Sequence, residues 1–215
     1  MKHFIENNAD LNNKNFFNDA PIHLISKDLS FTFEKMKVLV ESKCDVNSFD
    51  GNKNTSLILF SKSKAHPEVI QYLGIIFYFF IFFHIFFIFF FFLVEKKADL
   101  NLVNNKKNTA LHCACENLDI SFEKIKFLVE NKAEINSKNN NQDTPLHLAC
   151  KNDCITLEII EYLIEKKSDI LIRNTQKRTA FNICNENKNV EKEIIKKYGE
   201  KGIEKLLYAK KCHIF

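Results

Sequence analysis

The chain has 215 residues and a formal net charge of +4, from 31 basic and 27 acidic side chains that are mixed along its length. This length allows one large domain or two small ones, and the mixed charges argue against a nucleic-acid-binding protein. Seven cysteines, an odd number without a tight framework, are typical of a reducing compartment. The opening stretch MKHFIENNADLN lacks the apolar segment that a secretory signal requires.

Two short phrases recur along the chain in step with each other. The first is FIENNADLN, and its copies end at Asn12, Asn47, Asn101, Asn136 and Leu171. The second is represented by TPLHLAC, and its copies begin at Ala20, Thr55, Thr109, Thr144 and Thr179. Both series are spaced by 35, 54, 35 and 35 residues. A period of this length indicates a solenoid of stacked structural units.

Each unit is predicted to be a pair of helices. Thr109 and Thr144 are favourable N-caps, and Pro145 fits the first helical position, so we expect first helices near residues 110–117 and 145–152. The second helices carry apolar residues at helical spacing. These residues are Phe122, Ile125, Leu128 and Val129 in one unit, and Leu157, Ile160, Leu163 and Ile164 in the next. Polar segments such as NSKNNNQD then form turns between units.

The units resemble the ankyrin repeat. TPLHLAC is close to that family's T-P-L-H-x-A signature, which Thr109, His112, Thr144, Pro145 and His147 match in two units; the Thr55 and Thr179 units match less well. The resemblance implies an all-α ankyrin-repeat solenoid of helix-turn-helix units with short turn or hairpin tips, in which the histidines hydrogen-bond within and between repeats. We predict a partial N-terminal repeat over 1–12, about four repeats over 13–199, and a C-terminal helical cap over 200–215.

An aromatic block interrupts the third repeat. Residues 74–93 hold 11 of the 22 phenylalanines, and deleting these 20 residues reduces the 54-residue spacing to 34. The 60 nucleotides from the second position of the Gly74 codon to the first position of the Val94 codon can begin with GT, end with TAG and be rich in T between, as in a translated intron. We therefore expect a retained intron or a gene-model error, and a functional protein that lacks 74–93. The alternative is a transmembrane helix over 74–94, and a buried soluble helix is the third interpretation.

No cluster of chemically reactive residues has the spacing of a known active site. Cys113, Cys115, Cys150 and Cys154, with His112 and His147, do not show zinc-site spacings, and repeat register explains Cys115 and Cys150 as small residues that pack between units. Phosphate loops and nucleophile motifs are also missing from the sequence. We therefore expect no enzyme activity, no metal and no cofactor.

The resemblance implies a protein–protein interaction module, a scaffold or adaptor whose partner binds along the tips and the first-helix face. We expect a monomer in the cytoplasm or nucleus, with another protein as partner rather than nucleic acid or a small molecule. The lysines and asparagines of the tips suggest an acidic or hydrogen-bonding partner. Two alternatives stay open: a membrane-anchored protein, and the ankyrin arm of a larger enzyme whose catalytic domain lies beyond a truncated N-terminus. The predicted contact residues are Phe49, Asp50, Asn52, Lys53, Asn104, Asn105, Lys106, Lys107, Asn139, Asn140, Asn141, Gln142, Thr175, Gln176 and Lys177.

Overall fold

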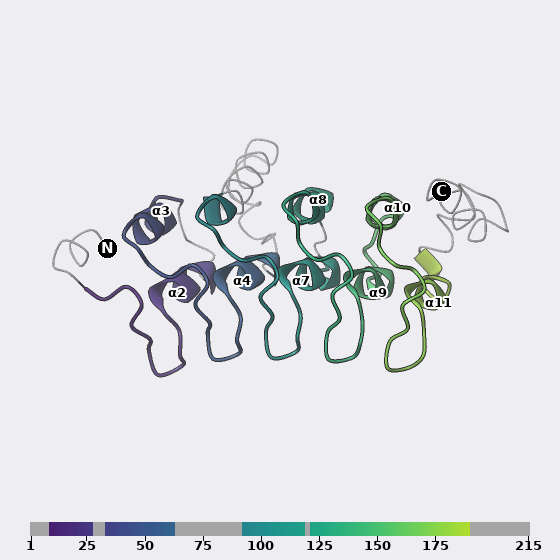
Figure 1. The fold of residues 1–215 in the computed structure, drawn as a ribbon, viewed down its shortest axis with the longest axis horizontal. Helices are drawn as coiled ribbons and strands as arrows, with labels where there is room; N and C mark the ends of the chain where they lie inside the picture. Colours follow the sequence, from purple (N-terminus) through teal and green to yellow (C-terminus); the bar gives the residue numbers. More distant parts are fainter. Residues whose placement is uncertain (1–8, 28–32, 63–91, 119–120, 190–215) are drawn as a thin grey trace, which may run out of the picture. The chain divides into compact units, whose positions relative to one another are not determined.

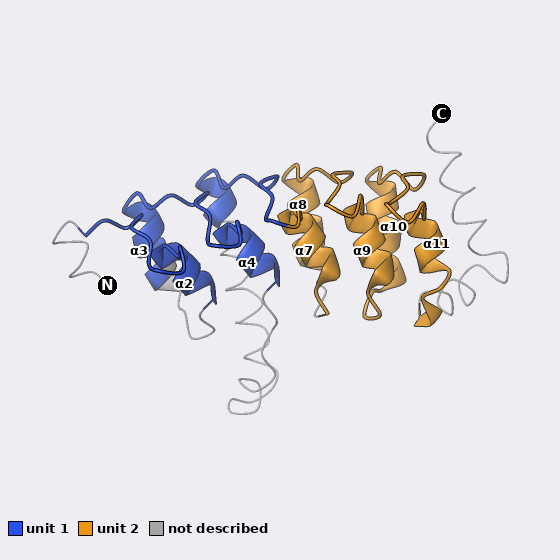
Figure 2. Ribbon diagram, turned by 90° about the horizontal axis from the view of Figure 1, so that it is seen from below, with its two compact units in different colours: residues 1–105 blue, residues 106–215 orange. Residues whose placement is uncertain are grey.

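The computed structural model describes residues 9–27, 33–62, 92–118 and 121–189. The chain divides into two compact units, Met1–Asn105 and Lys106–Phe215, and each is described by itself (Figure 2). In the described ranges all regular elements are helices, and the one extended pairing is an isolated bridge between Arg173 and Thr179. The predicted all-α class is therefore confirmed.

Unit 1 contains α2 (Pro21–Lys27), α3 (Phe33–Glu41) and α4 (Ser56–Lys62). The short first helices α2 and α4 pack against each other, and α3 packs back onto α2 (Figure 1). Ile22, Leu39 and Leu57 are among the fully buried side chains of this core. Two layers of helices thus bury one apolar seam, as a stacked helix pair requires.

Unit 2 repeats the same arrangement with α7 (Ala110–Glu116), α8 (Phe122–Glu130), α9 (Pro145–Lys151), α10 (Leu157–Glu165) and α11 (Ala180–Cys184). The first helices α7, α9 and α11 pack side by side, and α8 and α10 form a second layer over them (Figure 1).

Helix boundaries in unit 2 agree with the sequence prediction to within one residue. The first helices end at Glu116 and Lys151, and the following asparagines act as C-caps. On α8, Ile125 and Leu128 are fully buried as expected. Phe122 is only half-buried, and its ring packs edge-to-face on Tyr162 of α10 at 5.2 Å between centroids. Phe127, which the predicted apolar face left out, is buried as well.

Most of the aromatic block lies outside the described residues, so the predicted absence of 74–93 is untested. Residues 92–95, which start at the described end of the block, are helical, and Leu93 is fully buried. The Leu93 carbonyl accepts a hydrogen bond from Ala98 N at 2.9 Å, as the Leu128 carbonyl does from Ala133 N. Leu93 therefore occupies the repeating second-helix position that Leu73 would take if residues 74–93 were removed.

Three other predicted segments fall wholly or partly outside the described residues. These are residues 1–8 of the partial first repeat, the end of the last repeat from residue 190, and the C-terminal cap over 200–215. Among the helices that are described, none combines the length and apolar character needed to cross a bilayer.

Candidate functional site: the hairpin tips

A five-residue hairpin tip precedes each first helix. By repeat register the tips are Asn15–Asp19, Asp50–Asn54, Asn104–Asn108, Asn139–Asp143 and Asn174–Arg178. Within a tip, the backbone N–H of the first residue donates to the carbonyl of the fifth, at 3.0 Å from Asn139 to Asp143 and 2.9 Å from Asn174 to Arg178. The same closure occurs in unit 1 from Asp50 to Asn54, at 3.0 Å.

The first side chain of a tip holds the turn together from inside. The Asn139 Oδ1 atom accepts hydrogen bonds from the N–H groups of Asn141 at 2.9 Å and Asp143 at 3.0 Å. Asp50 does the same for Asn52 and Asn54, each at 2.8 Å. Asn and Asp recur at this position because only a short side chain with an acceptor oxygen can close such a turn.

This internal role corrects part of the predicted contact set. Asp50, Asn104 and Asn139 are buried, so their side chains cannot meet a partner, and Phe49 is half-buried. The other predicted contact residues are exposed: Asn52, Lys53, Asn105, Lys106, Lys107, Asn140, Asn141, Gln142, Thr175, Gln176 and Lys177. Their binding role stays a prediction.

Neighbouring tips are joined by buried amides and by backbone hydrogen bonds. In unit 2 the Asn139 Nδ2 group donates to Asn108 Oδ1 at 2.9 Å, and Asn174 Nδ2 donates to Asp143 Oδ1 at 2.8 Å. Thr175 N also donates to the carbonyl of Asn141 at 2.9 Å. In unit 1, Asn105 N donates to the Asn52 carbonyl at 3.1 Å. The tips of each unit therefore form a row whose spacing is fixed.

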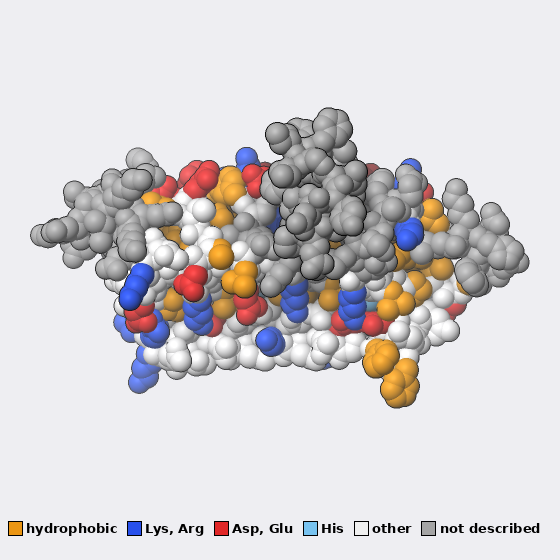
Figure 3. Space-filling model, turned by 180° about the vertical axis from the view of Figure 1, so that it is seen from behind, with side chains coloured by type: hydrophobic (Ala, Val, Ile, Leu, Met, Phe, Trp, Pro, Cys, Tyr) orange, Lys and Arg blue, Asp and Glu red, His pale blue; other side chains and the backbone are white. Residues whose placement is uncertain are grey.

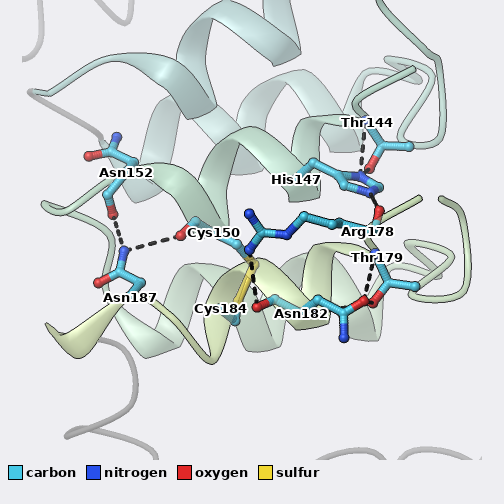
Figure 4. Close-up of a disulfide and its surroundings, with 9 residues drawn as sticks. All are labelled: Thr144, His147, Cys150, Asn152, Arg178, Thr179, Asn182, Cys184 and Asn187. Atoms are coloured by element: carbon cyan, nitrogen blue, oxygen red, sulfur yellow. Dashed lines mark hydrogen bonds between the residues drawn. A yellow bond between two sulfur atoms is a disulfide. The ribbon is translucent and has the colours of Figure 1, made fainter. Parts of the chain in front are cut away.

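Buried histidines tie the first helices α7 and α9 to the base of the next tip. His112 Nδ1 accepts from Thr109 N at 3.2 Å, so Nε2 carries the proton and donates to the Asp143 carbonyl at 3.0 Å. His147 repeats this with Thr144 N and the Arg178 carbonyl, at 3.1 and 3.2 Å (Figure 4). The expectation that these histidines bond within and between repeats is confirmed. Burial lowers the pKa of His112 to about 4 and also lowers that of His147.

The carboxylates at the tips point inward and form ion pairs with lysines of the first helices. Lys151 Nζ lies 2.6 Å from Asp143, and Lys27 lies 2.5 Å from Asp19 and 3.3 Å from Asp50. Burial alone would raise the pKa of Asp50, but hydrogen bonds from Asn54, Asn52 and Lys27 outweigh it and lower that pKa. These carboxylates are therefore paired within the chain.

The exposed charges of the tips are all basic. No exposed carboxylate occurs within the five tips or at the residue that directly precedes each of them. The exposed cations on and beside the tips are Lys14, Lys53, Lys106, Lys107, Lys138, Arg173 and Lys177. Each unit therefore presents positive charge along its row.

Several tip residues have a left-handed backbone that glycine would adopt more easily. Lys53, Lys107 and Lys177 have φ values of 56°, 57° and 59°. Lysines at the ends of the second helices do the same, for example Lys132 and Lys167 with φ of 71° and 72°. Because both places use lysine in this conformation, the backbone strain is not a sign of function.

Sequence reasoning missed the first tip. Phe16 and Phe17 project from it with 98% and 74% of their surface exposed. Its position could have been found by counting one period back from Asp50–Asn54.

The cysteines differ from the prediction in one respect. Cys150 is buried between first helices as expected, but its Sγ is bonded to Cys184 of α11, so the interpretation as a simple packing residue is wrong (Figure 4). Cys115 is buried, and burial raises the pKa of its thiol. The residues that the structure describes contain no group of three or more side chains able to hold a metal ion.

The comparisons with known proteins agree with this architecture. A family model described as ankyrin repeats (3 copies) matches residues 86–174 and 121–205. The comparison with curated proteins gives no match. The two matched ranges together cover more than half of the chain, and they include the helix pairs and tips of unit 2. The chain therefore belongs to the ankyrin-repeat family.

Proposed function

We propose that this protein is a non-catalytic scaffold or adaptor, a monomer that binds an acidic surface of another protein through its hairpin tips. Ankyrin repeats are generally protein–protein interaction modules and are typically non-catalytic. What we add to this general role is the binding surface, which is the row of tips, and the kind of partner, which is acidic.

The single observation that carries the proposal is the separation of charge at the tips. Lysines such as Lys53, Lys107 and Lys177 face solvent, whereas Asp50 and Asp143 are buried against first-helix lysines. An acidic partner would therefore meet attraction along the row without a nearby carboxylate to repel it. Complementary charge of this kind chiefly raises the association rate and selects among partners.

The hydrogen-bonded row also reduces the entropic cost of binding. Asn139 fixes its own turn and is bonded to the preceding tip through Asn108, so the backbone is ordered before a partner arrives. Binding to a surface that is already ordered loses less conformational entropy than binding to flexible loops.

Site-specific photo-crosslinking tests the proposal and identifies the partner. A photoreactive amino acid replaces exposed Gln142 on a tip, or exposed Glu158 on α10 as the matched control. Crosslinking in the source cells should yield one acidic protein from position 142 and none from position 158. If position 158 captures the partner and position 142 does not, the second-helix face is the binding surface and the proposal is wrong.

We propose the cytoplasm or nucleus as the location, as the scattered cysteines suggested. The Cys150–Cys184 bond is the observation that speaks for an oxidising compartment instead. Cell fractionation followed by non-reducing electrophoresis compares the two: a disulfide-bonded chain found only in secretory fractions would contradict the proposed location.

A further inference from the structure

The first tip of unit 1 carries a projecting aromatic pair, Phe16 and Phe17. With 98% and 74% of their surface exposed, they are the most exposed large apolar side chains in the described residues. Their rings contact each other edge-to-face at 5.8 Å between centroids. Hydrophobic side chains stand out beyond the polar edge of the tips (Figure 3). A single exposed phenylalanine is common on protein surfaces, but two adjacent ones at the end of a turn form a projecting apolar surface. We call Phe16 and Phe17 together the wedge.

The backbone beneath the pair is firmly held. The Asn15 Oδ1 atom accepts from Phe17 N and Asp19 N, each at 2.9 Å. The neighbouring tip approaches so closely that a Cβ added to Gly51 would lie 2.8 Å from the Phe17 carbonyl oxygen. The wedge therefore projects from a turn whose backbone is held by hydrogen bonds to Asn15 and lies close to the backbone of the second tip.

Among the residues of the first two tips and those directly before them, the exposed charged side chains are both lysines. Lys14 and Lys53 are exposed, and Lys14 Nζ donates to the Phe49 carbonyl at 2.7 Å, which holds it beside the second tip. The two carboxylates of these tips, Asp19 and Asp50, are buried and paired with Lys27. The first tip, with Lys14 before it and Lys53 on the second tip, thus offers apolar and cationic contact groups, and the carboxylates of these two tips are buried.

We propose that the Phe16–Phe17 wedge docks into the headgroup region of an anionic lipid bilayer. This step goes beyond the protein-binding function proposed above. Phenylalanine partitions into the interfacial region, and lysines beside it are attracted to anionic headgroups. A fluid lipid surface can close around two projecting rings, whereas a protein would need a socket shaped for both. Two aromatic rings and two lysines provide weak, reversible docking, because stable anchoring takes stronger paired signals.

A tryptophan reporter on the full chain tests this proposal directly, because the sequence contains no tryptophan. Phe16→Trp places the only indole on the wedge. Asn140→Trp is the matched control, at the equivalent second position of a tip in unit 2 that carries no aromatic residue. The probes are vesicles of phosphatidylcholine alone and of phosphatidylcholine mixed with phosphatidylserine, with and without brominated acyl chains.

With phosphatidylserine vesicles, the Phe16→Trp emission should shift to shorter wavelength and be quenched by bromine, while Asn140→Trp stays unchanged. Adding Lys14→Gln and Lys53→Gln should weaken the apparent vesicle affinity by about tenfold or more, the scale expected for two lysines near an anionic surface.

Three results would overturn the proposal. The first is unshifted Phe16→Trp emission at saturating phosphatidylserine vesicles. The second is an equal shift with phosphatidylcholine alone or in Asn140→Trp, since this would assign binding to another part of the chain. The third is a shift produced by the crosslinked partner protein and by no vesicle, which would assign the wedge to a protein socket.

Discussion

Acidification should weaken the repeat stack through its buried histidines. His112 is fully buried and uses both ring nitrogens, Nδ1 as an acceptor from Thr109 N and Nε2 as a donor to the Asp143 carbonyl. Protonation of Nδ1 would replace an acceptor by a donor that faces an N–H group. The folded chain therefore resists the proton that an exposed histidine accepts readily.

The size of this effect follows from the two pKa values. The pKa of His112 falls from 6.5 to about 4 in the folded state, because burial disfavours the charged ring. Above pH 6.5 neither state binds the proton, so the stabilising contribution is fully present. Between pH 6.5 and 4 only the unfolded chain binds it, and lowering the pH from 7 to 5 should reduce the free energy of unfolding by about 2 kcal/mol through His112. His147 acts in the same direction, since its pKa is also lowered.

His112→Asn is the matched variant, and the chain supplies its precedent. Asn182 occupies the same position in the last repeat, where its Oδ1 accepts from Thr179 N at 2.9 Å. The variant keeps the cap and loses the bond to the Asp143 carbonyl, which should cost about 1 kcal/mol at pH 7. It does not titrate, however, so at pH 5 it should be about 1 kcal/mol more stable than the parent.

Urea unfolding followed by far-ultraviolet circular dichroism measures both proteins at both pH values. For this experiment residues 74–93 are deleted from both the parent and the variant, so that the aromatic block cannot cause aggregation. The order of stability should reverse between pH 7, where the parent is more stable, and pH 5, where His112→Asn is more stable. A difference between parent and variant that is the same at both pH values would refute the reasoning about His112.

Three further outcomes are expected. Gly51→Ala should destabilise unit 1 by about 1–3 kcal/mol and speed amide exchange at Phe17, because the new Cβ meets the Phe17 carbonyl oxygen at 2.8 Å; exchange at the parental rate would contradict the close approach. Cys184→Ser should lower stability by about 4 kcal/mol under oxidising conditions and leave it nearly unchanged with reductant, given the 34-residue separation from Cys150; peptide mapping that finds only thiols in the parent would remove that expectation. Deletion of 74–93 should give a soluble, cooperatively unfolding chain, while the parent aggregates or needs detergent; a mature transcript that keeps all 60 nucleotides, with parent protein in the membrane fraction, would favour the transmembrane alternative.

The fold could be predicted because its signals are local and repeated. Thr144 caps a helix, Pro145 suits its first turn, and His147 sits three residues after the cap, so this phrase specifies a helix start. The weaker copies begin a helix at the same position of the phrase. The period then places the copies beside one another without knowledge of any long-range contact.

The character of the tips was harder to predict, because polarity alone does not separate a contact residue from a structural one. Asn139 and Asn140 are neighbours of one type, yet the first is buried as a turn acceptor and the second is exposed. Comparing the repeats could have separated the two kinds of residue. Asn or Asp occupies the first position of all five tips, which indicates a structural role, while the second position varies from Phe16 to Thr175.

The Cys150–Cys184 disulfide could not be predicted from the sequence for a different reason. Cys150 lies six residues after Thr144, whereas Cys184 lies five after Thr179, so the two are not equivalent in the repeat. They meet because α9 and α11 pack against each other and bring the two Cα atoms to 4.7 Å, which spacing in the sequence does not reveal.

The central claim is that exposed tip lysines bind the partner, and a matched pair of triple variants tests it most directly. Two sets of exposed lysines share a left-handed backbone and differ only in place. The tip set is Lys53, Lys107 and Lys177, and the helix-end set is Lys97, Lys132 and Lys167. Each set is changed to glutamate, and the affinity for the crosslinked partner is measured by calorimetry, with circular dichroism as the check on folding.

The tip variant should lose about tenfold or more in affinity, and the loss should shrink at high salt, whereas the helix-end variant should bind like the parent. Equal affinity in the tip variant and the parent, with both folded, would contradict the claim and move the binding surface to the first-helix face.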